Sequence, residues 1–383
     1  MSVEHGTQPL VLVLNAGSSS LKYRLLRGDR TRASGIVERI GEAGGRAGDH
    51  AEAFGQVVAE LGAAADGLAV VGHRVVHGGT RFRAATVVDD TVLAAIDELA
   101  PLAPLHNPAN AQGIRAARQR YPQVPQVAVF DTAFHADLPA AAATYALDAA
   151  LAARHGIRRY GFHGTSHRYV AGRTAALLGR PLAELNTIVL HLGNGASATA
   201  VARGRSVETS MGMTPLEGLV MGTRSGDIDP AVVFHLLRAG MSADEVEAAL
   251  ERQGGLRGLC GANDVRDLLS RVDDGDPAAT LALDVYCHRI RKYVGAYHAV
   301  LGRLDAVAFT AGVGEHAVAV RARALAGLAP LGIGIDPARD TSAATGERVV
   351  SPPGARVAVC VVPTDEELAI AQESVAAVAA TRD

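Results

Sequence analysis

The chain has 383 residues, which is long enough for two domains, and its formal net charge of −3 excludes a protein that binds nucleic acid through a basic excess. Hydrophobic residues make up 48% of the chain but aromatic residues only 4%, so alanine, valine and leucine must fill the cores. Cys260, Cys287 and Cys360 are too far apart for a metal knuckle or a CxxC motif, and we expect buried thiols.

The first residues have neither the basic start nor the apolar stretch of a secretory signal, and no segment approaches the length that spans a bilayer. We therefore expect a cytoplasmic protein with no membrane partner and no nucleic-acid partner.

The first predicted strand, at residues 10–14, runs into the polar turn Asn15-Ala-Gly-Ser-Ser-Ser-Leu-Lys22. Gly17 can adopt backbone angles closed to other residues, the serines add small donors, and Lys22 adds a mobile positive charge. Lys22 stands out because only two of the 37 basic residues are lysines. The pattern predicts a phosphate cradle, and an ordinary serine-rich hairpin turn is the alternative.

Apolar periodicity predicts an α/β order along the rest of the chain. The first part holds a second strand at 21–26, a helix near 50–65, a strand at 70–76, helices at 91–99 and 110–120, and a strand at 127–130. After a connecting region at 135–160, a strand–turn–strand pattern returns at 187–201, and a strand with a glycine turn follows at 306–315. Further helices are expected at 230–239, 243–252 and 277–302, then a strand at 356–362 and a last helix at 368–379. The repeated pattern suggests two related lobes, whose three turns could surround one nucleotide.

Eight motifs together are far more specific than any one glycine loop. They are Asn15 to Lys22, Gly72-His-Arg-Val-Val-His-Gly-Gly79, Leu105-His-Asn107, Phe130-Asp-Thr-Ala-Phe-His135, Tyr160-Gly-Phe-His-Gly-Thr-Ser-His167, His191-Leu-Gly-Asn-Gly195, Met221-Gly-Thr-Arg224 and Pro363 to Glu367. Through them the chain resembles the acetate kinases nearly end to end. Propionate and butyrate kinases share much of this pattern.

The resemblance implies an α/β protein of two actin-like, ribonuclease H-like lobes with an interlobe cleft. Residues 1–134 and 368–383 would form the N-terminal lobe, with the phosphate hairpin and the acyl site. Residues 135–367 would form the C-terminal lobe, which binds the nucleotide and carries a homodimer interface. The implied reaction is reversible, Mg²⁺-dependent, in-line phosphoryl transfer from ATP to acetate, which gives ADP and acetyl phosphate.

Such a reaction needs no general base, because a carboxylate is already ionised at pH 7. The obstacle is anion–anion repulsion, about 4 kcal/mol per charge pair at ~4 Å with an effective dielectric near 20. Arginine offsets this repulsion, since its planar fork can hold a carboxylate or a phosphoryl group. The resemblance makes Arg74 the ligand of the acyl carboxylate, and Arg224 and His163 the ligands of the moving phosphoryl group. Asp131 matches the catalytic aspartate of the family, and we expect it to orient Arg224 and the substrate.

The resemblance also implies an acyl site and a metal site. The acyl site would be lined by Val76, Leu105, His106, Phe162 and Pro215 beside Arg74. Asn15 and Glu366 would bind Mg²⁺, or Mn²⁺ in its place, although an acidic residue in a first helical turn commonly serves as a cap.

The nucleotide, ATP or ADP, would contact residues from both lobes. They are Ser18, Ser20, Lys22, His191, Leu192, Gly193, Asn194, Gly195, Asp264, Val265, Arg266, Gly312, Val313, Gly314, Glu315 and His316. The family often has asparagine where this chain has His316.

Three alternatives stay open at this point. Propionate or butyrate could be the acyl substrate, because one methylene is worth only about 1 to 3 kcal/mol of discrimination. An actin-like ATPase switch would share the phosphate loops but be indifferent to acetate. A hydrolase dyad of Ser166 and His167 would lack the GxSxG elbow.

Overall fold

The computed structural model describes residues 8–17, 19–42, 44–342 and 345–381. The chain divides into two compact units, Met1–Ala136 with Asp365–Asp383, and Asp137–Thr364. These limits differ by two or three residues from the expected ones, so that the acidic segment Asp365 to Glu367 lies in the first unit. No helix in the described ranges is long and apolar enough to cross a membrane.

The first unit is built on a six-stranded sheet of order β3-β2-β1-β4-β6-β5. Its strands are β1 (Leu10–Ala16), β2 (Ser20–Arg27), β3 (Arg30–Glu38), β4 (Leu68–Val75), β5 (Thr86–Val87) and β6 (Gln126–Phe130). The first three strands form an antiparallel meander, whereas β4 and β6 run parallel to β1. The carboxyl ends of β1, β4 and β6 therefore meet at one edge of the sheet.

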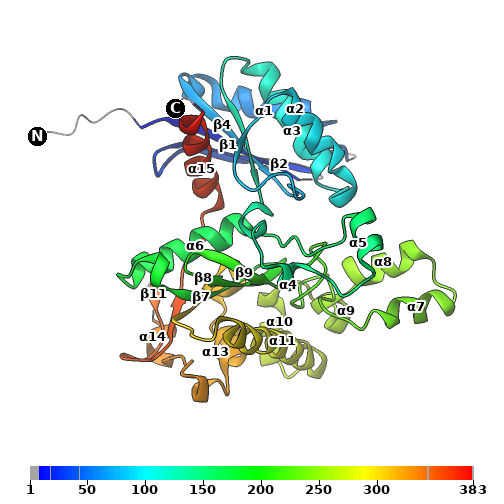
Figure 1. The fold of residues 1–383 in the computed structure, drawn as a ribbon, viewed down its shortest axis with the longest axis vertical. Coiled ribbons are helices and arrows are strands. Elements are labelled where there is room, and N and C mark those ends of the chain that lie inside the picture. Colours follow the sequence, from blue (N-terminus) through cyan, green and yellow to red (C-terminus); the bar gives the residue numbers. More distant parts are fainter. Residues whose placement is uncertain (1–7, 18, 43, 343–344, 382–383) are drawn as a thin grey trace, which may run out of the picture. The chain divides into compact units, whose positions relative to one another are not determined.

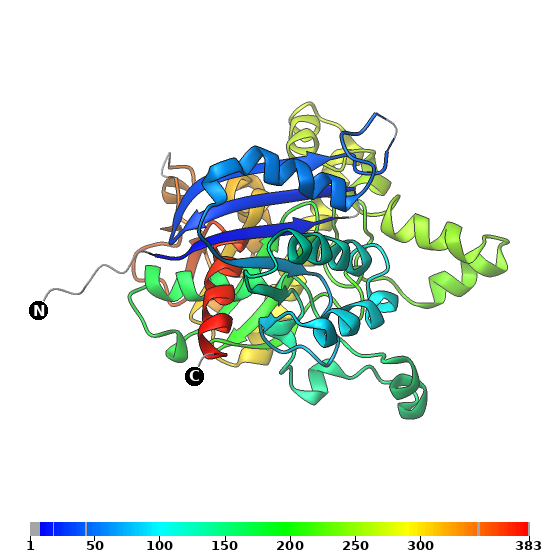
Figure 2. The ribbon, with the colours of Figure 1, turned by 90° about the horizontal axis from the view of Figure 1, so that it is seen from above.

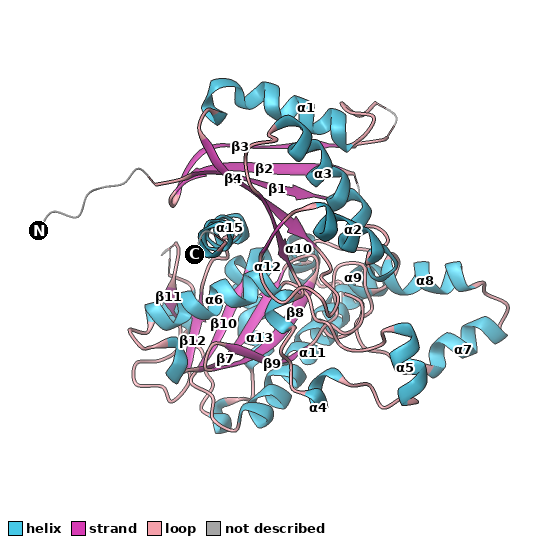
Figure 3. Cartoon of the chain, turned by 45° about the horizontal axis from the view of Figure 1, so that its top comes forward, coloured by secondary structure: helices cyan, strands magenta, loops and turns pink. Residues whose placement is uncertain are grey.

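Helices cover both faces of this sheet. They are α1 (His50–Leu61), the 3₁₀ turn Gly62–Ala65, α2 (Asp90–Glu98), the 3₁₀ turn Ala100–Leu102, α3 (Asn107–Arg120), the 3₁₀ turn Ala133–His135 and α15 (Glu366–Ala380). Strand residues alternate between the two faces. Leu12 and Leu14 of β1 pack in the core with α1, whereas Val11 and Val13 pack in the core with α15. Figure 3 shows α1 and α3 on one face and α15 on the other. The carboxyl-terminal helix thus lies beside the amino-terminal strands (Figure 1).

The second unit repeats the same plan with a sheet of order β11-β12-β10-β7-β8-β9. Its strands are β7 (Asn186–Leu192), β8 (Ala196–Ala202), β9 (Arg205–Thr209), β10 (Ala306–Thr310), β11 (Arg348–Val349) and β12 (Ala358–Val361). Again a three-stranded meander pairs with two parallel strands and an antiparallel edge strand. The prediction of two α/β, ribonuclease H-like lobes is confirmed, and the equal strand orders agree with the suggested relationship between them.

The helices of the second unit occupy long connections. They are α4 (Ala140–Ala143), α5 (Ala149–His155), α6 (Gly164–Leu177), the 3₁₀ turn Leu182–Glu184, α7 (Ala231–Arg238), α8 (Ala243–Glu251), α9 (Gly255–Cys260), α10 (Val265–Asp273), α11 (Pro277–Leu301), α12 (Ala311–His316), α13 (Val318–Leu325), the 3₁₀ turn Ala329–Leu331 and α14 (Pro337–Asp340). Helices α7 and α8 project away from the sheet of this unit in two perpendicular views (Figures 1 and 2).

Two expectations from the sequence are wrong in detail. The segment 311–315 is not a glycine turn but part of the short helix α12, which starts directly after β10 at Ala311, a residue with a φ of 62°. The sequence prediction took Gly312 and Gly314 as signs of a turn, but both residues lie within the helix. Cys287 and Cys360 are buried as expected, but Cys260 at the end of α9 is only half-buried.

Candidate active site

Three polar side chains meet at the carboxyl edge of the first sheet. Asn15 of β1 is paired in register with Arg74 of β4, and Asp131 follows directly after β6. The Asp131 N–H donates to the carbonyl of Val75 at 3.0 Å, which extends the β4–β6 pairing by one residue. Asn15 and Arg74 are register partners, and Asp131 lies two residues beyond Val129, the partner of Arg74 on β6, so the three side chains point to the same face.

Arg74 is held by the other two residues. Its Nε donates to Asp131 Oδ1 and Oδ2, both at 3.1 Å, and its Nη2 donates to Oδ2 at 2.6 Å. Its Nη1 donates to Asn15 Oδ1 at 3.2 Å. A guanidinium has five N–H groups. The described contacts therefore leave one N–H on each terminal nitrogen of Arg74, which is the pair that a second carboxylate requires.

Burial and charge set the ionisation of this pair. The side chain of Asp131 is 2% exposed and that of Arg74 is 22% exposed. Burial raises the pKa of Asp131, and this outweighs the opposing effects of Arg74 and His106. Burial acts to lower the pKa of Arg74, but the charges of Asp131 and Glu366 outweigh it and raise the pKa above its usual value. Arg74 is thus a permanent cation in this site.

Within the first unit, Asp131 has an arginine partner that the sequence did not predict. The expected role of Asp131 was to orient Arg224 and the substrate, and its carboxylate is engaged by Arg74. Strand pairing is the reason, because Asp131 directly follows the last β4–β6 pair and its N–H donates to the carbonyl of Val75, the neighbour of Arg74. The assignment required knowledge of strand order, which a single sequence does not contain.

The acidic start of α15 approaches the same site. Asp365 is bonded to Arg24 at 2.6 Å, and Glu367 forms an ion pair with Lys22. Glu366, between them, has no hydrogen bond or ion pair within the described ranges, but its charge acts on the pKa of Arg74. Two of the three carboxylates are therefore paired with cations of the sheet, and Glu366 has no such partner among the described residues.

Asn15 and Glu366 fit the expected metal site in their chemistry, because both offer oxygen atoms and Mg²⁺ keeps much of its water. Among the residues the structure describes, no three or more His, Cys, Asp or Glu residues form a group that could hold a metal ion.

The turn after β1 is braced by backbone and side-chain bonds. Gly17 N–H donates to the carbonyl of Ser20 at 2.8 Å, and the ring Nε2 of His50 lies 2.7 Å from the carbonyl of Gly17. Ser20 begins β2 and is half-buried, and Ser18 lies outside the described residues. Lys22 is exposed and paired with Glu367, a partner that the sequence reading did not foresee.

The acyl-site residues of the first unit differ in exposure. Val76 follows β4 and is 7% exposed, whereas Leu105, before α3, is 59% exposed. His106 is half-buried at the start of α3, and its charge acts on the pKa of Asp131. Val76 and His106 thus lie in the neighbourhood of the Arg74–Asp131 pair.

In the second unit, histidines and hydroxyls form a bonded cluster at the start of α6. His163 and His191 are stacked, with ring centroids 4.3 Å apart and an interplanar angle of 22°. Ser197 Oγ lies 2.9 Å from His163 Nδ1 and 2.7 Å from His167 Nε2. Ser166 Oγ lies 2.8 Å from His191 Nδ1. Ser166 and His167 therefore bond to different partners, and the hydrolase dyad is wrong.

Gly195 brings His163 and Arg224 together. A Cβ atom built on Gly195 would lie 3.6 Å from Arg224 Nη1 and 3.6 Å from His163 Cε1. Arg224 Nη1 donates to the carbonyl of Pro215 at 3.2 Å, which also places Pro215 beside this group. Burial lowers the pKa of Arg224 against the effect of Glu251. A cation and an imidazole thus flank a small-residue turn.

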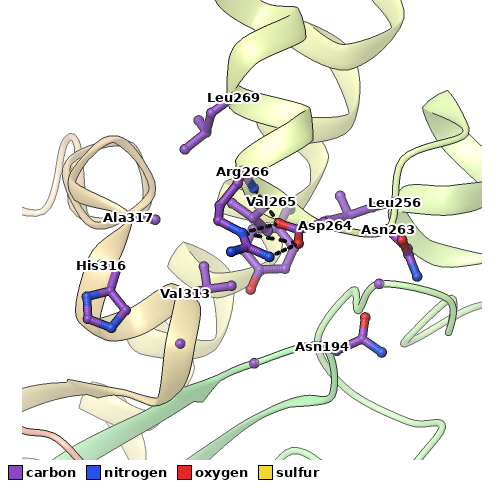
Figure 4. Close-up of a pocket in the computed structure, with 14 residues that line it drawn as sticks. Asn194, Leu256, Asn263, Asp264, Val265, Arg266, Leu269, Val313, His316 and Ala317 are labelled. Carbon is purple, nitrogen blue, oxygen red and sulfur yellow. Dashed lines mark hydrogen bonds and ion pairs between the residues drawn. The ribbon is translucent and has the colours of Figure 1, made fainter.

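A pocket of about 440 Å³ lies in the second unit. It is lined by Gly193, Asn194, Gly222, Leu256, Asn263, Asp264, Val265, Arg266, Leu269, Tyr286, Gly312, Val313, His316 and Ala317. Figure 4 shows Val313 and His316 on one helix and Asp264 with Arg266 on the neighbouring one. The Arg266 Nη2 donates to Asp264 Oδ2 at 2.6 Å, and the hydrogen bonds from Arg266 lower the pKa of Asp264 to about 2.

The structure brings most of the predicted nucleotide residues of the second unit into this pocket, but not all. His191, Leu192, Gly195, Gly314 and Glu315 are not among its lining residues. Leu192 is fully buried, and Glu315 Oε1 accepts a hydrogen bond from Thr364 N–H at 3.3 Å. These two support the pocket rather than line it.

Several lining residues were missed by sequence reasoning. They are Gly222, Leu256, Asn263, Leu269, Tyr286 and Ala317. The apolar ones lie on helices α9, α10, α11 or beside α12, where they look like ordinary core residues. Asn263 lies directly before the helix cap Asp264, and the start of a helix, where backbone N–H groups can bind an anion, was the signal that could have found it.

The comparisons agree with this geometry. A model of the acetokinase family matches residues 10–372. The chain belongs to the acetokinase family. A curated relative named acetate kinase, from Streptomyces avermitilis, is 58% identical and covers 96% of this chain and 97% of its own length.

Two solved structures of this family are similar in fold. A crystal structure of Porphyromonas gingivalis acetate kinase has a TM-score of 0.92 at 39% identity and covers 97% of this chain and 100% of the solved chain. A propionate kinase from Francisella tularensis has a TM-score of 0.90, also at 39% identity, and covers 96% of this chain and 100% of the solved chain. Membership in the acetokinase family makes the protein a phosphotransferase.

Proposed function

We propose that this protein is an acetate kinase, which transfers a phosphoryl group reversibly between ATP and acetate with Mg²⁺. The observation that carries the proposal is Arg74, a cation held by Asp131 and Asn15 with one N–H left on each terminal nitrogen. The names of the relatives at more than half sequence identity support acetate as the acceptor.

The proposed reaction is a direct in-line displacement. A carboxylate oxygen of acetate forms the new bond to the γ-phosphorus, and the bond from that phosphorus to the bridging oxygen of ADP breaks. No proton has to leave acetate, since acetate is ionised at pH 7. The residues therefore act by charge and position, with Arg74 on the carboxylate and Arg224 and His163 on the phosphoryl oxygens.

The nucleotide would bind in the pocket of the second unit. Its apolar lining, with Leu256, Leu269 and Val313, suits a purine base, and Gly312, where an added Cβ would meet nothing within 4 Å, leaves room for backbone contact with the nucleotide. Asn15 and Glu366 would hold Mg²⁺, which neutralises phosphate charge when bound. The bond-free carboxylate of Glu366 within the described residues supports this assignment.

The preference for acetate or propionate depends on the apolar residues that line the acyl site. Val76, Leu105, Phe162 and Pro215 are the proposed walls. A methylene is worth about 1 to 3 kcal/mol in such a site. We propose acetate as the preferred acid, with propionate as a weaker substrate. Measuring kcat/KM for acetate, propionate and butyrate tests this ranking.

The central test uses two arginines and two controls. Arg74→Ala and Arg224→Ala are assayed for acyl phosphate trapped as the hydroxamate, beside Arg30→Ala and Arg252→Ala, which remove exposed arginines. We expect each site variant to lose at least about 100-fold in kcat/KM, since a charged hydrogen-bonding group is removed, and the controls to stay within about twofold. Near wild-type turnover in both site variants would end the proposal.

An ATPase switch is the alternative from a different class. ATP turnover by the wild-type protein, measured with and without acetate, separates the two functions. A kinase should consume ATP in proportion to acyl phosphate formed, whereas a switch should hydrolyse ATP at the same rate in both conditions.

We further propose a homodimer in the cytoplasm. Helix α7 has no buried residue, and the side chains of Val232, Phe234 and Leu237 on it are exposed. An exposed apolar helix surface commonly marks a protein–protein interface, and a second copy of this chain is the partner expected for this family. Three free cysteines and the use of ATP support the cytoplasm as the compartment.

A further inference from the structure

We propose that Asn110 is a positioning residue that sets the spacing between the phosphate hairpin after β1 and the acyl-binding turn after β4. The inference rests on the proposed function, because it concerns the site in which Arg74 binds the acyl carboxylate. Asn110 lies in the first turn of α3 and is 2% exposed, so its amide must be satisfied inside the protein.

The bonds of Asn110 begin where the sheet pairing ends. The register of β1 with β4 stops at the pair Asn15 and Arg74. One residue further, Asn110 Nδ2 donates to the carbonyl of Ala16 at 2.7 Å. Two residues beyond Arg74, the N–H of Val76 donates to Asn110 Oδ1 at 3.1 Å. A side-chain amide thus replaces the next sheet hydrogen bond and connects the two strand ends.

An amide suits this position because both of its ends are used. An ionised carboxylate has no donor, and a hydroxyl donates and accepts through the same oxygen atom. Neither group can therefore offer a donor and an acceptor at a fixed separation, as an amide does. Asn107, three residues earlier on the same face, acts similarly, since its Oδ1 accepts from His77 N–H at 3.1 Å and its Nδ2 donates to the His77 carbonyl at 3.0 Å. The first turn of α3 therefore holds the whole turn after β4.

Helix α3 is itself fixed against these strand ends. Ala111 and Ile114 are fully buried in a core with Val75 of β4. A Cβ atom built on Gly113 would lie 3.5 Å from Ala16 Cβ, so the helix approaches the end of β1 closely. A rigid helix that grips both Ala16 and Val76 determines where Asn15 and Arg74, one or two residues away, present their side chains.

The chain offers a matched control for the loss of a buried amide. Gln126 at the start of β6 is 4% exposed, and it also uses both ends of its amide. Its Oε1 lies 2.8 Å from His73 Nε2, and its Nε2 donates to the Val124 carbonyl at 2.9 Å. Gln126 lies at the amino end of its strand, opposite the edge that carries Arg74 and Asp131.

The test compares Asn110→Ala with Gln126→Ala in the full-length protein. Both changes are expected to lower the thermal midpoint. Asn110→Ala should also raise KM for acetate about tenfold, weaken the preference for acetate over propionate and leave KM for ATP within about twofold. Gln126→Ala should leave all three kinetic values within about twofold. Equal kinetic behaviour of the two variants would overturn the inference.

A second variant protects the test against misfolding. Asn110→Asp leaves no cavity and retains an acceptor for Val76, but it turns a carboxylate oxygen toward the Ala16 carbonyl, so its KM for acetate should rise at least as much as that of Asn110→Ala. No rise in a soluble Asn110→Asp contradicts the proposed role. Failure of the wild-type protein to form acetyl phosphate would instead reject the proposed function, so the two failures are distinguishable.

Discussion

Arg74 and Asp131 form an ion pair across two neighbouring parallel strands, in which Nε and Nη2 of the arginine both donate to the carboxylate. The pair exists because β4 and β6 end at the same edge of the sheet and their last residues are in register. Asp131 is thereby a residue that orients the acyl-binding cation. It needs no role as a base.

We predict that Asp131→Asn lowers kcat/KM for acetate by about 30-fold or more, because truncating the charge of one partner in a buried pair commonly costs ~2 to 5 kcal/mol. The variant leaves Arg74 without its counter-ion and free to turn from the site. The hydroxamate assay at saturating ATP measures the effect.

The matched control is Asp97→Asn. Asp97 pairs with Arg115 at the surface, where both side chains are close to half exposed. Exposed pairs contribute little, so activity and stability should stay near wild type. If Asp131→Asn keeps wild-type efficiency while Arg74→Ala loses it, the orienting role of Asp131 is wrong.

A glycine on β4 allows α15 to bring its acidic start to the site. A Cβ atom on Gly72 would lie 2.5 Å from Ser374 Oγ and 3.0 Å from Ile370 Cγ2. We predict that Gly72→Ala shifts α15 and with it Glu366, which raises the Mg²⁺ concentration required for half-maximal activity severalfold. Overpacking of this kind also costs about 1 to 3 kcal/mol of stability.

Gly55→Ala in α1 is the comparison for this change. A Cβ atom on Gly55 meets nothing within 4 Å, so alanine should stabilise the helix by up to about 1 kcal/mol and leave the Mg²⁺ requirement unchanged. An unchanged Mg²⁺ requirement in Gly72→Ala would contradict the link between helix packing and the metal site.

Two buried histidines predict that stability falls in mild acid. Burial lowers the pKa of both His73 and His77 from about 6.5 to about 4. Between these values the unfolded chain binds protons that the folded chain does not, so stability is present above pH 6.5 and is lost as the pH falls toward 4. The full loss is about 3 kcal/mol per histidine.

Urea denaturation at a series of pH values from 7 to 4 measures this slope. His73→Gln removes one titrating group and keeps a donor toward Gln126, so its slope should be shallower than that of the wild type. His155→Gln removes an exposed histidine and should not change the slope. Identical slopes in wild type and His73→Gln would show that another group governs acid stability.

If α7 forms the proposed dimer contact, a charged substitution on it should lower the molar mass of the protein in solution. Phe234 is 57% exposed on a helix with no buried residue. Phe234→Asp places a charge on the surface that a second copy would cover, and light scattering should then report a monomer. Ile36→Asp, at a 51% exposed position of the first unit, should keep the wild-type mass. A dimer that survives Phe234→Asp would place the interface elsewhere.

Much of the secondary structure followed from local pattern. The apolar run Leu10 to Leu14, the helical spacing at 110–120 and the acidic start before Leu368 each predicted an element that the structure contains. Local pattern works here because the apolar period of a strand or a helix depends on residues that are neighbours in sequence. It failed at 311–315, where glycines lie inside a short helix.

The sequence by itself determined the α/β class, the repeated plan of the two units and the identity of the candidate residues in motifs such as Gly72 to Gly79. Only the tertiary structure decided that Asp131 pairs with Arg74, that Glu367 takes Lys22 while Glu366 does not, and that Asn110 connects Ala16 with Val76. These pairings join residues that lie far apart along the chain, and they depend on strand order, register and the approach of helices. The spacing of residues along a single chain does not contain these pairings, because the packing of one element on another determines them.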